Sequence, residues 1–303
     1  MGFEASGHSV QPSADSSITG DPLVLHQALA ELNRLRMTPS RGTSTWASML
    51  STEQQLRLLE HRFVESERAR VRDWAAQAPT QADSFVKWFV DLVRVGPGQG
   101  DPLFPWLASE ATLAQLRWFL SQEMAGEAGF DDLVALTQLR LPNRVKLEMA
   151  RNYWDEMGRG KASGMHGPML AQLGQVLRLT PSGAGVTWEA LALGNLMMAL
   201  AANRHYTYES VGALGVIELT APGRANLVNV GLKRLGLCGD ARRYYALHAT
   251  LDVQHSEAWN REVLWPLVEQ DPQRARSIAE GALMRLAAGA RCFVRYRAEL
   301  MRS

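Results

Sequence analysis

The spacing of apolar residues constrains the fold of this chain more than any other feature. Between residues 21 and 300, leucine, alanine, valine and phenylalanine recur every three or four positions, which is the period of an amphipathic helix. The Asp21-Pro22 pair at the start of this region is a typical helix-start signal. No segment shows a convincing two-residue alternation, so the sequence requires no strands. It therefore predicts an all-α fold.

Glycine and proline divide this pattern into separate predicted helices. We expect helices at about 21–38, 51–78, 82–95, 109–140, 142–158, 165–178, 187–203, 207–219, 223–236, 241–269 and 272–300. A helical bundle of this kind builds its metal sites from inward-facing side chains on adjacent helices. Polar residues on otherwise apolar helices are therefore the first candidates for a site.

A glycine- and proline-rich run at residues 96–102 marks a predicted boundary between two helical parts. Residues 1–20 are rich in serine and glycine and have little to bury, so we expect a disordered tail. Residues 21–100 would then be an N-terminal helical appendage. Residues 101–303 would form the main helical domain, which is long enough to bury a substantial core.

The charge balance gives no support to polyanionic partners. Lys and Arg number 32 and Asp and Glu 31, so the net charge of +1 indicates neither nucleic acid nor a membrane surface as a partner. The N-terminus lacks a secretion signal, and no stretch reaches the roughly 18 apolar residues of a membrane span. Cys238 and Cys292 are far apart and indicate neither a disulfide framework nor a thiolate metal site. We expect a cytoplasmic protein that acts on a small molecule.

His248, Asp252 and His255 are spaced by four and then three positions, which places them on one face of a helix. The positions between them are mostly apolar, so the three polar groups would be desolvated unless they gain partners. A bound metal is one such partner, because imidazole and carboxylate suit iron, manganese or zinc. An exposed polar face, or a core histidine bonded to its neighbouring aspartate, is the alternative.

Two further segments carry polar residues whose neighbours are mostly apolar residues or glycines. Glu218 lies in an almost wholly apolar run and is either a metal ligand or the partner of a base such as Arg224. Glu156 and His166 are ten residues apart, and three intervening glycines permit a bulge that brings them together. This glycine-rich segment is also a candidate hinge or gate.

Glu123 and Glu127 are the remaining carboxylate candidates, four residues apart among apolar and small residues. Either one, or both, can face the interior of the bundle, and an ordinary solvated face is the alternative. Of the two we favour Glu123, because it follows directly on an apolar run at residues 118–120.

Taken in chain order, the candidates are four carboxylates and three imidazoles: Glu123, Glu156, His166, Glu218, His248, Asp252 and His255. This pattern resembles the haem-oxygenase-like diiron oxidase and oxygenase family, whose helices supply a Glu, a Glu with a His about ten residues on, a Glu, and His-x3-Asp-x2-His. The stretches NYWDEMG at 152–158 and GVIELTAP at 215–222 also look like the corresponding stretches of family members. The resemblance covers about residues 105–300. It implies a haem-oxygenase-like helical bundle with an N-terminal extension and these seven residues as metal ligands, with Glu127 as the alternative to Glu123.

The resemblance also implies a reaction. Two Fe(II) ions per chain would use O2 as cosubstrate to oxidise a small amine or amino-acid-derived metabolite, by N-oxygenation or by oxidative desaturation or cleavage, in a biosynthetic pathway. Chain order suggests how the ligands divide: Glu123, His166 and His255 in one half, Glu218, His248 and Asp252 in the other, and Glu156 bridging.

Tyr153, Trp154 and Tyr245 are candidates for supporting the ligands, or are ordinary core residues. N-terminal helices often form a dimerising layer in relatives, so the resemblance also implies a homodimer. Two other classes stay open. One is a cofactor-independent enzyme of the same wider fold, which would need a catalytic cysteine or its equivalent. The other is a non-catalytic helical protein that binds iron or a partner.

Overall fold

The computed structural model describes residues 20–39, 46–180 and 185–301 of the chain. Regular structure in these ranges is helical, and the β pairing within them is an isolated bridge between Met157 and Met165. The predicted all-α fold is therefore confirmed. In chain order the α-helices are α1 (Pro22–Met37), α2 (Trp46–Ala75), α3 (Ala82–Val95), α4 (Leu103–Ser109), α5 (Leu113–Gly126), α6 (Phe130–Thr137), α7 (Asn143–Glu156), α8 (His166–Leu177), α9 (Trp188–Ala202), α10 (Thr207–Arg234), α11 (Arg243–Trp259), α12 (Trp265–Gln270) and α13 (Arg274–Leu300).

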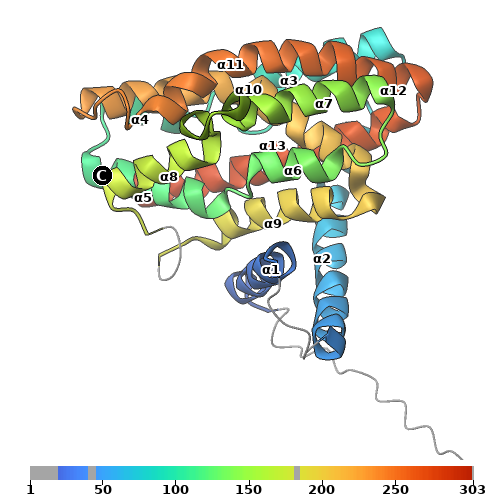
Figure 1. Cartoon of the computed structure of the whole chain (residues 1–303), viewed down its shortest axis with the longest axis horizontal. Coiled ribbons are helices and arrows are strands. Elements are labelled where there is room, and N and C mark those ends of the chain that lie inside the picture. The colour runs from blue at the N-terminus through green and yellow to red at the C-terminus, as the bar shows by residue number, and fades with distance from the viewer. Residues whose placement is uncertain (1–19, 40–45, 181–184, 302–303) are drawn as a thin grey trace, which may run out of the picture.

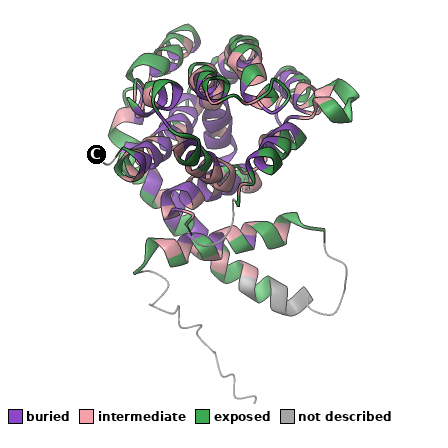
Figure 2. Ribbon diagram, turned by 90° about the vertical axis from the view of Figure 1, so that its left-hand side faces the viewer, coloured by how far each residue is buried: buried purple, intermediate pink, exposed green. Residues whose placement is uncertain are grey.

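The helices form an elongated bundle whose buried faces turn toward a common interior. In Figure 1, α7, α10 and α11 lie above α6, α8 and α9, with α13 between the two groups and in contact with both α10 and α9. Figure 2, turned by 90°, shows the buried residues on the inner faces of these helices. None of the described helices combines the length and apolar character that crossing a membrane requires.

The pair α10 and α13 forms the tightest crossing in the bundle, and two glycines make it possible. A Cβ atom on Gly212 would collide with the carbonyl of Ile278, and one on Gly281 with the carbonyl of Glu209. Because neither glycine has a side chain, the two backbones approach closely enough to exclude water from the interface. The crossing fixes the positions of the side chains that α10 and α13 present to the interior.

The N-terminal helices attach to the body through buried polar contacts. Figure 1 shows α1 and one end of α2 projecting from the bundle, while the other end of α2 lies against it. Arg68 of α2 pairs with Glu209 of α10 at 2.8 Å, and Glu67 pairs with Arg291 of α13 at 2.7 Å. The predicted division at residues 96–102 remains a prediction, and the tail predicted at 1–20 lies outside the described residues except for Gly20.

Two of the predicted helix boundaries are wrong. The helix expected at 109–140 stops after α5 and restarts as α6, because Gly129 adopts a left-handed conformation with φ of 74°. The break expected at residues 220–222 does not occur, and α10 runs through Pro222 without interruption. A proline inside a helix removes one backbone hydrogen bond and strains the preceding turn. Packing of α10 against α11, α13 and α4 holds the helix together there.

Candidate metal centre

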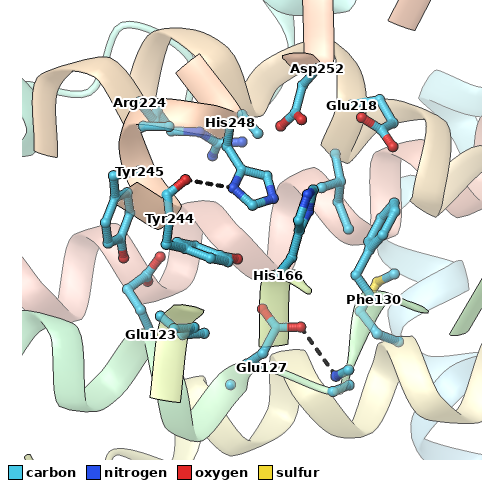
Figure 3. A pocket seen from close by; sticks show the side chains of 18 of the residues that line it. Glu123, Glu127, Phe130, His166, Glu218, Arg224, Tyr244, Tyr245, His248 and Asp252 are labelled. Atoms are coloured by element: carbon cyan, nitrogen blue, oxygen red, sulfur yellow. Dashed lines mark hydrogen bonds between the residues drawn. The ribbon is translucent and has the colours of Figure 1, made fainter. Parts of the chain in front are cut away.

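Six of the seven predicted ligands line one cavity of about 210 Å³ inside the bundle, and the seventh, His255, lies 3.5 Å from Glu218. Its wall is formed by residues of α5, α7, α8, α10 and α11, among others. Figure 3 shows His166 and His248 projecting into it, with Glu218 and Asp252 beside them. A single water needs roughly 10–15 Å³ of such space, so this cavity has room for a ligand of about ten non-hydrogen atoms as well as ions.

Glu156, His166 and His248 form the first of two triplets of candidate metal ligands. Their ligand atoms all lie within 4.8 Å of one another. His166 Nδ1 is 2.7 Å from a Glu156 carboxylate oxygen, yet it is buried without a hydrogen bond of acceptable geometry. These two atoms lie close together without forming a hydrogen bond. This is the arrangement expected of two side chains that bind the same metal ion.

The glycine-rich segment between Glu156 and His166 brings these two residues together, as the sequence predicted. The chain leaves α7, makes two short 3-10 turns at Gly158–Gly160 and Ala162–Gly164, and enters α8 at His166. Gly158 has a positive φ of 63°, and a Cβ there would collide with the backbone of Gly164. The loop therefore folds back tightly, and the Met157–Met165 bridge closes it. Its role as a hinge or gate remains a prediction.

His248 is oriented by its own helix. Its Nδ1 lies 2.8 Å from the carbonyl oxygen of Tyr244, one turn earlier in α11. Nδ1 then carries the proton and donates it to the carbonyl, which leaves Nε2 free to bind a metal. Burial lowers the pKa of His248, so the neutral, ligating form is favoured.

Glu218, Asp252 and His255 form the second triplet, again with ligand atoms within 4.8 Å of one another. Asn152 of α7 donates its amide to Glu218 Oε1 at 2.6 Å and fixes that carboxylate. Asp155, also on α7, lies 3.1 Å from His255 Nε2. The other ring nitrogen, Nδ1, is buried without a hydrogen bond and lies 3.5 Å from Glu218 Oε2. It is therefore the nitrogen available to a metal.

The protonation of the second triplet is compatible with a bound cation. Burial raises the pKa of Glu218, and burial together with the nearby Glu218 charge raises the pKa of Asp252 to about 9. For His255, burial opposes the charged form, but the nearby carboxylates of Glu218 and Asp155 outweigh it and raise its pKa to about 9. Without a metal these groups hold protons that a divalent ion would displace. The donor set of imidazoles and carboxylates suits iron, so the residues fit the expected group.

Glu123 and Glu127 line the same cavity but belong to neither triplet. Glu127, at the end of α5, accepts a hydrogen bond from the Gly129 backbone N–H at 3.1 Å. Glu127 is an exposed residue, yet burial of its carboxyl group among its neighbours and the negative charge of nearby Glu156 raise its pKa. Glu123 lies one turn earlier, where the charges of Arg224 and Arg285 oppose the rise that burial causes in its pKa. These surroundings favour Glu127 as the carboxylate that completes the first triplet.

The structure divides the ligands differently from the order along the chain. His248 lies with Glu156 and His166, and His255 lies with Glu218 and Asp252. The prediction places each of these two histidines in the opposite half of the site. Seven residues separate the two histidines, which is about 10 Å along a helix, so each reaches a different part of the cavity. The alternative pairing of Glu218 with Arg224 is also wrong, because Arg224 donates to Thr220 instead.

Several supporting residues differ from those expected. Trp154 is 53% exposed and does not line the cavity, whereas Tyr245 does line it. Asn152, Asp155 and Tyr244 orient the candidate ligands, and the sequence analysis assigned them no role. The available signal was their position: Asn152 and Asp155 stand four and one residues before Glu156 on the same helix.

Comparisons with known proteins bear on the fold and the family of the chain. The crystal structure of a CADD-like protein of unknown function from Nostoc punctiforme superposes with a TM-score of 0.51, covering 81% of this chain and 100% of that chain at 16% identity. At that identity the likeness shows the shared fold alone. No curated protein sequence matches the chain. The family model described as "iron-containing redox enzyme" matches residues 117–290, which hold more than half of the chain and all seven predicted ligands. The chain therefore belongs to the iron-containing redox enzyme family.

Proposed function

We propose that this protein is an O2-dependent non-haem diiron oxygenase or oxidase that acts on a small amine or amino-acid-derived metabolite. The observation that carries the proposal is the presence of two separate His-carboxylate triplets that meet at one internal cavity. A single catalytic ion with an open position needs only about three protein ligands. Six well-oriented ligands in two groups therefore support two ions.

Each residue of the centre has a distinct task in this proposal. Glu156, His166 and His248 hold one ion and Glu218, Asp252 and His255 hold the other. The seventh ligand is Glu123 or Glu127, and the surroundings of the two favour Glu127. Bound iron would supply the electrons for reduction of O2, chemistry for which side chains have no equivalent.

The residues around the ligands hold protons away from the metal-binding atoms. Asp155 keeps the proton of His255 on Nε2, and the Tyr244 carbonyl keeps that of His248 on Nδ1. Asn152 occupies one oxygen of Glu218 and leaves the other for an ion. The surrounding helices enclose the cavity, which limits water at the reacting atoms.

Neither alternative class gains support from a particular observation. A thiol mechanism would need a reactive cysteine, but burial raises the pKa of Cys292 to about 12, and Cys238 is exposed and does not line the cavity. A protein that only stores or carries iron has no need of a cavity that reaches beyond the ligands.

We also propose that the protein is a homodimer. The helices α1 and α2, which project from the bundle, carry exposed apolar side chains, including Val24, Leu35, Leu50 and Leu58. Apolar patches of this kind often mark contacts between chains. Light scattering after size exclusion should then give twice the 33.5 kDa mass of one chain, and a mass of 33.5 kDa would contradict the proposal.

Anaerobic titration with Fe(II), followed by exposure to O2, tests the enzymatic proposal. We expect uptake of about two ions per chain and a transient absorption band after mixing with O2. Glu218→Ala and His248→Ala should lose the band but keep the helical circular dichroism of the wild type. His205→Ala is the matched control, because His205 is exposed and does not line the cavity. Absence of iron uptake, or normal reactivity in both ligand variants, would show the assignment to be wrong.

A further inference from the structure

One wall of the cavity carries two arginines that no carboxylate neutralises. Arg224 of α10 and Arg285 of α13 both line the cavity, and neither forms an ion pair within the described residues. Arg285 Nε is buried without a hydrogen-bond partner. Arg224 donates to the carbonyl and hydroxyl oxygens of Thr220, which are uncharged acceptors. Two cations therefore face the cavity without a matching anion.

The surroundings of these arginines make their charges costly. The ring centroids of Phe104 and Phe293 lie 5.8 and 5.4 Å from the Arg224 guanidinium carbon, and these cation–π contacts stabilise the charge less than an ion pair would. Burial and the neighbouring Arg285 charge lower the pKa of Arg224 to about 10, so it stays charged at neutral pH. Burying a cation without a partner is unfavourable by several kcal/mol in general. A bound anion would remove that cost.

Two acidic side chains, Glu123 and Glu127, lie near this group without forming an ion pair with it, and Glu127 acts on Arg285. The Glu123 charge acts on both arginines, but its carboxylate lies beyond ion-pair distance of each. Figure 3 shows Glu123 below Tyr245, on the same side of the cavity as Arg224 and away from Glu218 and Asp252. Neither guanidinium therefore has a carboxylate partner at ion-pair distance, and the carboxylate of a bound molecule would supply one.

We propose that Arg224 and Arg285 bind the carboxylate of the substrate, so that the cavity takes a small carboxylic acid whose other end reaches the two ligand triplets. This inference rests on the proposed function for the identity of the bound molecule as substrate. The planar guanidinium fork matches a carboxylate in shape and charge. Arg224 follows Glu218 by six residues on α10, which is about 9 Å along the helix axis. A chain of amino-acid size spans that interval.

Isothermal titration calorimetry of the anaerobic Fe(II)-loaded protein with two probes tests this inference. The probes are hexanoate and hexanamide, which have similar shapes but differ in charge. Hexanoate should bind at least about tenfold more tightly, because hydrogen bonds between charged groups contribute more than neutral ones. Arg285→Gln should lose about tenfold in affinity for hexanoate and nothing for hexanamide. Arg285→Lys should keep part of the affinity, since it retains the charge but not the fork.

The matched variant is Glu123→Gln, which should change the affinity for hexanoate in the opposite direction. It removes a carboxylate that acts on both arginines, so hexanoate should bind more tightly to it than to the wild type. Equal affinity of the wild type for hexanoate and hexanamide would overturn the inference, as would undiminished hexanoate affinity in Arg285→Gln. Tighter binding of inorganic phosphate than of hexanoate would also overturn it, because the site would then take a dianion.

The same titrations separate this inference from the proposed function. Arg285 forms no hydrogen bond or ion pair with either triplet, so Arg285→Gln should take up iron as the wild type does. If the wild type bound no iron but still distinguished hexanoate from hexanamide through Arg285, only the proposed redox function would fail. If hexanoate binding required iron but not Arg285, the carboxylate would bind at the metal and the present inference would fail.

Discussion

Replacing Asp155 by asparagine should weaken one of the two metal sites and leave the other intact. The Asp155 carboxylate holds His255 Nε2 at 3.1 Å and Arg159 Nε at 2.5 Å, and its side chain is 12% exposed. The contact with His255 keeps the ring proton on Nε2 and turns Nδ1 toward Glu218. Asparagine has the same shape but lacks the charge that makes the imidazole a stronger ligand.

The size of the effect follows from this geometry. Loss of a hydrogen-bond partner behind a ligating histidine typically lowers metal affinity by about 10- to 100-fold, or ~1.4–2.7 kcal/mol. The asparagine carbonyl can still accept a hydrogen bond from Nε2, so Asp155→Asn should lie near tenfold. Asp155→Ala, which leaves no acceptor, should lie nearer a hundredfold. Only the ion held by the second triplet should be affected, because Asp155 does not contact the first.

Anaerobic competition with a coloured Fe(II) chelator measures both affinities in one experiment. The wild type should show two equivalents, and Asp155→Asn should show one of them weakened. Arg159→Gln is the control: it removes the other partner of Asp155, an exposed side chain, without touching His255. The reasoning is refuted if Asp155→Asn binds both equivalents like the wild type, or if Arg159→Gln weakens binding as much.

Three further predictions follow from particular contacts. Glu127→Gln should lower Fe(II) affinity by about tenfold in the chelator assay, whereas Glu123→Gln should leave it within about threefold; the reverse result would make Glu123 the seventh ligand. Gly281→Ala should lower the free energy of unfolding by about 3 kcal/mol or more in urea titrations, because the new Cβ meets the Glu209 backbone, and an unchanged midpoint would contradict this packing. Burial lowers the pKa of His26 from 6.5 to about 4. Between these two pH values the unfolded chain binds a proton that the folded chain does not. The free energy of unfolding should therefore fall by up to about 3 kcal/mol as the pH drops from 6.5 to 4. His26→Phe should remove this part of the pH dependence, and parallel curves for the two proteins would refute it.

Much of the fold could be predicted because helix periodicity is a local property. The break at Gly129 and the continuation through Pro222 could not, and for opposite reasons. From the local sequence, a single glycine is compatible with a continuous helix, and only the tertiary structure shows that Gly129 has a positive φ. A proline reads as a helix end until neighbouring helices hold the turn in place. Both outcomes depend on contacts between segments far apart in the sequence.

In the candidate site too, local sequence features could be recognised, whereas features that depend on tertiary contacts could not. The spacing of His248, Asp252 and His255 on one helix, and the glycines between Glu156 and His166, are local features that the sequence displays. The residues that orient these ligands are not marked in this way. Asp155 is an ordinary charged residue until α7 and α11 pack together, and only then does it meet His255. The exchange of His248 and His255 between the halves has the same origin, because rise along a helix separates residues that share a face.

The continuity of α10 matters most for what the cavity can bind. Had the chain broken at Pro222, Glu218 and Arg224 would lie on separate helices, and their separation would vary with the packing of each. Because α10 runs through Pro222, Glu218 of one triplet and Arg224 of the proposed carboxylate-binding pair stand on one rigid element, six residues apart. α13, locked to α10 by Gly212 and Gly281, adds Arg285 to the same frame. A substrate held by its carboxylate would therefore present one particular stretch of its chain to the metals, so the helix itself would set the position of attack.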